Sequence, residues 1–179
     1  ISTGQIMLGL FNRGNTPLGV HFDNLKIWDI SAIREQPTPL TLIYENRVPW
    51  SENNHTYEVV RVRNGITWEA ANQDAQARGG HLVTITSKAE NDFVFLIAST
   101  LENRDGYWLG GYQLPGSSEP DGGWIWVTGE PLGFTYWDSG EPNNSGDENY
   151  LEFHFENSPM WNDVNADNYF ANGYIIEYE

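Results

Sequence analysis

The chain has 179 residues, with 25 Asp and Glu against nine Lys and Arg, a formal net charge of −16, and no cysteine. This charge excludes binding to nucleic acid as a default function and disfavours anionic membrane surfaces, because both carry negative phosphates. The absence of cysteine excludes disulfides, Cys-ligated zinc and thiol catalysis. No apolar run approaches the ~18 residues of a membrane span, so we expect no membrane insertion. The chain begins at Ile1, so we expect a processed chain or a fragment.

The charge is distributed unevenly along the sequence. Residues 1–104 contain all nine Lys and Arg and eleven acids, a formal charge of −2. Residues 105–179 contain fourteen acids and no Lys or Arg, a formal charge of −14. Such a segment attracts cations, and carboxylate oxygens favour hard ions such as calcium or magnesium.

The first 54 residues are predicted to form two strands and a linker. Residues 5–11 and 20–30 are rich in strand formers and flank the turn-rich NRGNTPLG. A lone hairpin is marginal in water, so these strands need another sheet to pair with. Residues 1–30 resemble the last two strands of a concanavalin-like (laminin-G-like) β-sandwich. Residues 31–54, with three prolines, are predicted to be a linker.

Residues 55–179 are predicted to form a second, complete domain, whose first half contains the helices. A strand over 56–63 should close at an Asn64-Gly65 turn. A helix over 67–78 has an N-cap and a Gly-Gly stop, and a short strand over 81–85 follows. The sequence Ser87-x-x-Glu90 is typical of a capping box, so a second helix is predicted over 89–100.

The second half of this domain is predicted to contain short strands between long loops. The strands are expected at 107–111, 123–129, 149–155 and 173–179, and the loops are rich in Gly, Pro, Asn and Asp. Two helices followed by strands indicate an α+β fold. Loops of more than about 12 residues in a compact domain are usually functional.

Five oxygen-bearing side chains lie in and just after the loop GEPNNSGDENY, residues 140–150. They are Glu141, Asn143, Glu148, Asn162 and Asp163. Calcium takes about six to eight such oxygens, and mixed carboxylate and amide ligands suit it. An Asn that binds metal through its C=O keeps its NH2 as a donor, so a sugar on the ion could be hydrogen-bonded by the same side chains. EPNN alone is more often an ordinary surface turn, but a Glu seven positions after the first Glu, followed by WND, is far more specific.

This pattern resembles a C-type lectin-like domain, specifically a calcium-dependent carbohydrate-recognition domain of the mannose type. The resemblance covers residues 54–179. Its landmarks in chain order are WEAANQDAQARGGHLVTITS, YWLGG, WIWVTGEP, FTYW, EPN, WND and a closing GYIIEYE that resembles bacterial members.

The resemblance implies a principal site made of the same five residues. Glu141, Asn143, Glu148, Asn162 and Asp163 would hold Ca2+, and the first four would also bind carbohydrate. It implies a cis peptide bond before Pro142. EPN implies sugars with equatorial 3- and 4-hydroxyls, which are mannose, glucose, N-acetylglucosamine and fucose. The expected partners are therefore mannose-type glycans.

The sequence departs from the family in two respects. Four family cysteines fall on Ala75, Tyr150, Ala166 and Ile176, so both expected disulfides are missing and aromatic packing must compensate. The family's auxiliary calcium site is poorly matched. Its candidate residues are Glu119, Asp121, Asn144 and Asn149. One calcium is predicted, and a second at these four residues is kept as the weaker alternative.

The sequence therefore predicts an extracellular or cell-surface lectin of bacterial type. The alternative is an extracellular structural or assembly protein in which calcium is structural and residues 1–30 pair with another subunit. Glu141 and Glu148 could be a glycosidase pair, but their Asn and Asp neighbours suit a metal better, so no enzyme is predicted. Trp137 could stack on sugar, although core packing is the more frequent role.

Overall fold

The computed structural model describes residues 47–100, 106–153, 158–165 and 171–179. Contacts divide the chain into two units, Ile1–Leu42 and Ile43–Glu179, and every described residue belongs to the second. The strands and sandwich resemblance predicted for residues 1–30 lie outside the described residues, as do most of the predicted linker and Ala166.

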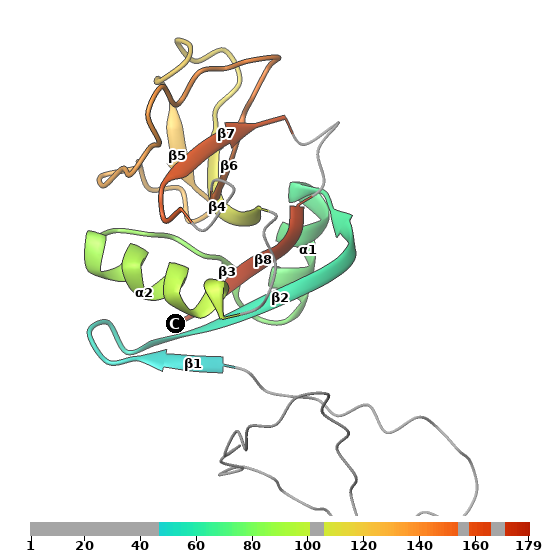
Figure 1. Ribbon diagram of the computed structural model, residues 1–179, viewed down its shortest axis with the longest axis vertical. Helices are drawn as coiled ribbons and strands as arrows, with labels where there is room; N and C mark the ends of the chain where they lie inside the picture. Colours follow the sequence, from blue (N-terminus) through green and yellow to red (C-terminus); the bar gives the residue numbers. More distant parts are fainter. Residues whose placement is uncertain (1–46, 101–105, 154–157, 166–170) are drawn as a thin grey trace, which may run out of the picture. The chain divides into compact units, whose positions relative to one another are not determined.

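The described part contains two helices and a sheet of mostly antiparallel strands, which confirms the predicted α+β class (Figure 1). The elements are β1 (Arg47–Trp50), β2 (His55–Ile66), α1 (Trp68–Ala77), β3 (His81–Leu82), α2 (Lys88–Ser99), β4 (Tyr107–Gln113), β5 (Trp124–Trp126), β6 (Tyr150–Phe153), β7 (Trp161–Val164) and β8 (Ala171–Tyr178). The strand order is β1-β2-β8-β4-β6-β7, with β3 on β8 and β5 on β4. The β4–β8 pair is parallel, and the other pairs are antiparallel.

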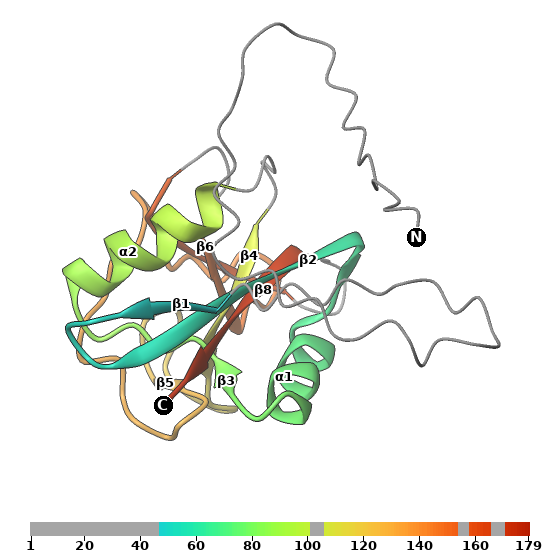
Figure 2. The same cartoon turned by 90° about the horizontal axis from the view of Figure 1, so that it is seen from below.

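The strands fall into two groups in space. Figure 1 shows β5, β6 and β7 with their loops at one end, and β1, β2 and both helices at the other, and Figure 2 shows α1 and α2 on either side of β2 and β8. Strands β8 and β4 join the two groups through the sheet. Neither described helix is long and apolar enough to cross a membrane.

Strand β1 differs from the prediction, which made the whole segment 31–54 a linker. It pairs with β2 from Arg47↔Glu58 to Trp50↔His55. Proline cannot donate to a strand ladder and is tolerated mainly on edge strands. Pro49 fits this rule, because β1 is the outer strand beside β2.

Strand β2 is longer than predicted and does not end at Asn64-Gly65. Its pairing with β8 shifts register between Arg61 and Ile66, and Gly65 has φ 75° there. The predicted turn is therefore wrong. The two residues form an irregularity within one strand, because pairing with β8 resumes beyond them.

Both helices begin at the predicted capping residues. Thr67 Oγ1 accepts from the Ala70 amide at 3.3 Å, and Ser87 Oγ accepts from the Glu90 amide at 3.2 Å. In a capping box the Glu90 carboxylate would accept from the backbone amide of Ser87, and it does not do so here. Its Oε2 accepts instead from the amide and hydroxyl of Thr86, both at 2.8 Å.

The core consists of two hydrophobic clusters, and aromatic residues dominate both. The largest fully buried aromatic side chains are Trp108, Trp126, Trp161, Tyr57 and Tyr174. Ala75 and Ile176, two positions where the resembled family has cysteine, are fully buried in the same cluster. At a third such position, Tyr150, the ring lies 4.9 Å from that of Trp68. Apolar packing thus occupies the three described positions where cysteine is missing.

Candidate functional site

The candidate site lies on the loop between β5 and β6 and on strand β7. The backbone of β7 holds residues 136–138 of this loop, since Asp138 N donates to Trp161 O at 2.9 Å and Trp161 N donates to Tyr136 O at 2.8 Å. The Trp137 ring packs 5.0 Å from Trp124 and 5.9 Å from Trp161. Trp137 is therefore a half-buried residue whose ring packs against the core and holds the loop there, and its stacking on a sugar stays a prediction.

Asp163 fastens the centre of the loop to β7. Its side chain is fully buried, with Oδ1 accepting from the Asn143 amide at 3.0 Å and Oδ2 from the Asn144 amide at 2.8 Å. Charge-assisted bonds of this kind compensate for the burial of a carboxylate. Asp163 lies within β7.

The loop then turns back so that Asn143 and Glu148 share one donor. The Ser145 amide donates to Asn143 Oδ1 at 2.7 Å and to Glu148 Oε2 at 2.8 Å. Asn144 Oδ1 accepts from the Glu148 amide at 2.7 Å. The turn requires left-handed backbone at Asn144 (φ 49°) and Asp147 (φ 70°), a conformation that Asn and Asp tolerate better than other non-glycine residues.

Within the part of the chain that the structure describes, Glu141 has one side-chain oxygen without a hydrogen-bond donor. Its peptide bond to Pro142 is cis, as the resemblance implied. Its Oε2 atom is buried and accepts no hydrogen bond within the described structure. Burial, together with the hydrogen bonding and negative charge of Asp163, raises the pKa of Glu141 to about 7, and Asn143 partly opposes this shift.

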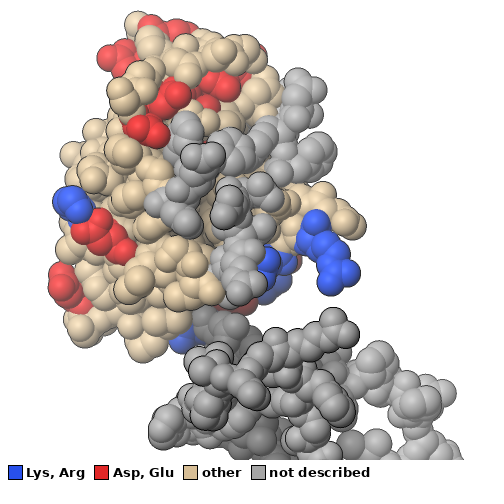
Figure 3. Space-filling model, viewed as in Figure 1, with Lys and Arg blue, Asp and Glu red and all other residues tan. Residues whose placement is uncertain are grey.

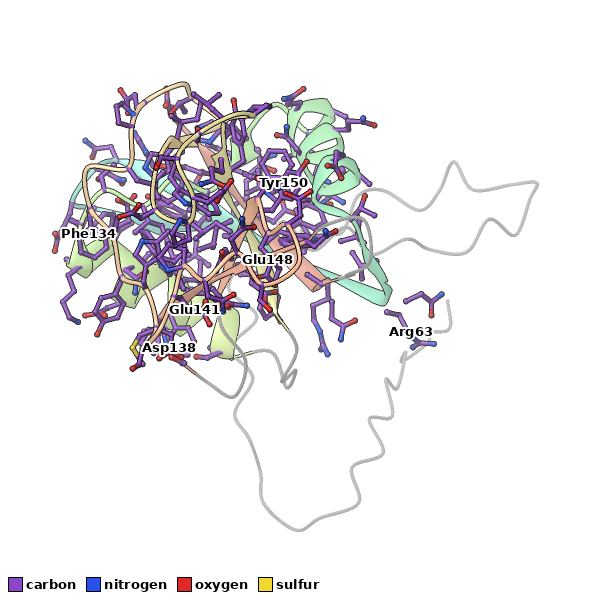
Figure 4. All side chains as sticks on the ribbon, turned by 90° about the horizontal axis from the view of Figure 1, so that it is seen from above. Arg63, Phe134, Asp138, Glu141, Glu148 and Tyr150 are labelled. Atoms are coloured by element: carbon purple, nitrogen blue, oxygen red, sulfur yellow. The ribbon has the colours of Figure 1, made fainter. Side chains whose placement is uncertain are left out.

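Glu148 is affected in the same direction. Burial and the charge of Asp163 raise its pKa, against the opposing effect of the Ser145 amide. Three carboxylates thus crowd together at this loop, and Figure 4 shows Glu141 and Glu148 in the same loop region. Burial and the repulsion between like charges therefore disfavour ionisation of Glu141 and Glu148, and the buried Oε2 of Glu141 has no donor among the described residues.

Hydrogen bonds and electrostatic interactions connect four of the five predicted residues, and the fifth, Asn162, lies beside them. Asn162 precedes Asp163 in β7, is half-buried and stands opposite Glu152 in the register. No described contact joins its side chain to the other four. Within the described residues, no three His, Cys, Asp or Glu side chains form a metal cluster on their own. A cation here would therefore need the amide oxygens of the Asn residues as well as the carboxylates.

The residues of the alternative second calcium site are not brought together by any described hydrogen bond or ion pair. Glu119 and Asp121 are exposed on the loop between β4 and β5. Asn144 Oδ1 is already used by the Glu148 amide, and Asn149 Nδ2 donates to Asp147. The second site stays a prediction from the sequence.

Sequence reasoning did not predict that Ser145 and Asn144 shape the loop, although Asn144 was named for the alternative second calcium site. The Ser145 amide joins two predicted ligands, and Asn144 bonds to both Asp163 and Glu148. The dense turn signal of NNSGD was the only clue available, and it indicates a tight loop rather than the partner of each amide.

The chain is similar to known proteins over most of the described domain. The family model described as Lectin C-type domain matches residues 64–172. A perlucin-like protein of Mytilus galloprovincialis is 33% identical over 102 residues, covering 56% of this chain and 63% of that protein. C-type lectin domain family 4 member M of Nomascus concolor is 41% identical over 107 residues, covering 57% of this chain and 25% of that protein. The chain therefore matches less than two thirds of the length of either relative.

Solved structures agree on the fold. The C-type carbohydrate-recognition domain of cow CD23, crystallised in the presence of GlcNAc2Man3 oligosaccharide, has a TM-score of 0.62 and 26% identity over 75% of this chain and 94% of that chain. A calcium-independent type II antifreeze protein has a TM-score of 0.61 at 18% identity, over 75% of this chain and 92% of that chain, and shows the fold alone. The two relatives named above are animal proteins, so the expectation of a bacterial source is not supported.

Proposed function

Because the chain belongs to the C-type lectin domain family, we propose that it binds glycans through a calcium ion held by one loop and β7. The five residues are those predicted from the sequence: Glu141, Asn143, Glu148, Asn162 and Asp163. The family is one of sugar-binding domains rather than enzymes, in agreement with the prediction that no residue is catalytic. We propose as well that the protein acts outside the cell or at the cell surface.

The observation that carries the calcium proposal is the buried, unpaired Oε2 of Glu141 beside Asp163 and Glu148. A buried carboxylate oxygen without a donor is costly, and a divalent ion would remove that cost. Oxygen atoms of carboxylates and amides are the ligands that calcium prefers, and softer metals would be expected to recruit His or Cys.

Calcium, when bound, supplies coordination for two vicinal sugar hydroxyls. The chain's own residues would then fix the orientation of the sugar. The NH2 groups of Asn143 and Asn162 can donate to the hydroxyl oxygens, and the carboxylates of Glu141 and Glu148 can accept from the hydroxyl protons. The EPN sequence supports mannose, glucose, N-acetylglucosamine or fucose as the sugar.

Titration calorimetry with methyl α-mannoside tests the proposal. We expect saturable binding in calcium and none in EDTA, with re-addition of calcium restoring it. Glu141→Gln should weaken calcium binding at least about tenfold, because it removes one ligand charge. Glu69→Gln, an exposed change on α1, is the matched control and should bind like the unaltered protein. Sugar binding that persists in EDTA would contradict the proposal.

The assembly protein that was predicted from the sequence as the alternative is the second candidate, and the fold is also found in a calcium-independent antifreeze protein. That likeness supports only the point that the fold serves functions without calcium. In this case calcium would at most stabilise the domain, and methyl α-mannoside would fail to bind even in saturating calcium.

A further inference from the structure

The proposed sugar site lies in a part of the chain that has no Lys or Arg. Residues 105–179 contain fourteen acids and no Lys or Arg, and both the loop and β7 fall within them. The described Lys and Arg residues are Arg47, Arg61, Arg63, Arg78 and Lys88. Figure 3 shows carboxylates over the loop end of the domain, and the basic groups over the end with the helices and β2.

The described cations are distant from the site or already neutralised. Arg61 and Arg63 lie on β2, which β8 and β4 separate from β6, a spacing of about 14 Å at ~4.8 Å per strand. Figure 4 shows Arg63 well apart from Glu141 and Glu148. Lys88 lies 5.4 Å from the Tyr136 ring, but its Nζ is 2.7 Å from the Asp92 carboxylate.

Calcium does not reverse the sign of the charge at the site. Glu141, Glu148 and Asp163 bring three negative charges, so one divalent ion leaves a net charge of about −1. Asp147 adds a further negative charge directly before Glu148. Its side chain is exposed, and its Oδ1 accepts from Asn149 Nδ2, a neutral donor that leaves the charge in place.

We propose that this site selects uncharged glycan ends and rejects glycans that carry carboxylate, sulfate or phosphate next to the calcium-bound hydroxyls, with Asp147 as one residue that sets this selectivity. The inference rests on the proposed function. A second anionic group on the sugar would meet uncompensated negative charge within about a Debye length, and no side chain of the loop or β7 could pair with it.

The test compares methyl α-mannoside with methyl α-mannoside 6-sulfate, because O6 is outside the 3,4-hydroxyl pair. Calorimetry in calcium at about 0.1 M NaCl, where charges about 14 Å away are largely screened, should show the sulfate binding about fivefold more weakly, and the difference should shrink toward about twofold at about 1 M NaCl. Asp147→Asn should bring the ratio of the two affinities closer to one, because it removes a negative charge. The structure of the loop should be kept, since Asn tolerates the left-handed backbone and retains the acceptor oxygen. Glu69→Gln removes a charge from α1 and should leave the ratio unchanged.

The outcomes separate this inference from the function on which it rests. Equal affinities for the two sugars, or tighter binding of the sulfate, would overturn the selectivity while leaving calcium-dependent binding intact. An equal effect of Asp147→Asn and Glu69→Gln would show that overall charge, and not Asp147, sets the ratio. If methyl α-mannoside does not bind in calcium, the proposed function fails, and the selectivity falls with it.

Discussion

Asp163 has two roles, which a comparison of substitutions at Asp163 and Glu148 can separate. Its two oxygens accept from the amides of Asn143 and Asn144, so it orders the loop before any ion binds. It also raises the pKa of Glu141 and Glu148, so it contributes to the negative potential that attracts the ion. The same buried carboxylate is therefore a structural anchor and a proposed ligand.

Asp163→Asn should destabilise the protein even without calcium. The new NH2 group would face a backbone amide, so one buried donor loses its acceptor, at a cost of about 1–3 kcal/mol. Denaturant unfolding in EDTA measures this. Glu148→Gln is the control, because its amide oxygen can still accept from Ser145, and it should lose calcium binding with little change in EDTA stability. Equal destabilisation by both variants would remove the anchoring role.

The raised pKa of Glu141 predicts that calcium binding depends on pH near neutrality. The ionised carboxylate is the ligand, so protons compete with calcium as pH falls through about 7. Without calcium the sign is opposite. A folded-state pKa above the unfolded value favours folding at low pH, and this contribution is lost as pH rises through about 7.

Calcium affinity measured by calorimetry should fall about tenfold between pH 8 and pH 6, with proton release on binding near pH 7. Proton release appears as a dependence of the heat on the ionisation enthalpy of the buffer. Glu141→Gln should bind weakly at both pH values and lose most of the dependence. An affinity that stays constant from pH 8 to pH 6 would contradict the assignment of Glu141 as a ligand.

At the scale of the elements, buried carboxylates join strands to helix α2. Tyr57 on β2 donates to Glu90 Oε1 on α2 at 2.6 Å. Glu177 on β8 lies 2.6 Å from His55 Nδ1 and accepts from the amide and hydroxyl of Thr84 at 2.9 and 2.8 Å. Burial raises the pKa of Tyr57, so its hydroxyl remains a donor at any ordinary pH.

Tyr57→Phe should therefore lower the free energy of unfolding by about 1–3 kcal/mol, because Glu90 keeps its buried carboxylate but loses a donor. Chemical denaturation by urea measures the loss. Calcium and sugar affinity should stay unchanged, since the network lies among β2, α2 and β8 rather than at the loop. Tyr136→Phe, a half-buried tyrosine on the loop side, is the matched control and should cost less. A Tyr57→Phe protein as stable as its parent would show that Asn53 or water replaces the hydroxyl.

The sequence predicts elements well where a side chain determines the local backbone. Thr67 and Ser87 cap helices where expected, because capping depends on residues a few positions apart. The sequence predicts elements poorly where pairing with a strand distant in the sequence determines the backbone conformation. Pairing with β2 makes a strand of β1 despite Pro49, and pairing with β8 carries β2 past Gly65. The ligand residues could be proposed from EPN and WND, but the amides that hold them come from the folded loop.

At the scale of the whole molecule, the domain has no disulfide, because the sequence has no cysteine. Without disulfides, stability comes from its two aromatic cores, from the buried hydrogen bonds described above and from any ligand that binds only the folded state. The loop between β5 and β6 belongs to neither helix nor strand over most of its length, and the hydrogen bonds of Asp163 hold it to β7. Calcium at this loop would therefore stabilise the whole domain through its least regular part.

Calcium should accordingly raise the thermal unfolding midpoint, and specific binding can be distinguished from the screening of a −16 charge. A free calcium concentration of about 100 times the Kd adds about 2.7 kcal/mol. Sodium chloride at the same ionic strength relieves only self-repulsion and should give a smaller rise that does not saturate. Glu141→Gln should retain the salt effect and lose the calcium effect, because the loop is still formed but one ligand charge is gone. Equal shifts from calcium and sodium chloride would mean that the negative charge of residues 105–179 attracts ions without forming a site.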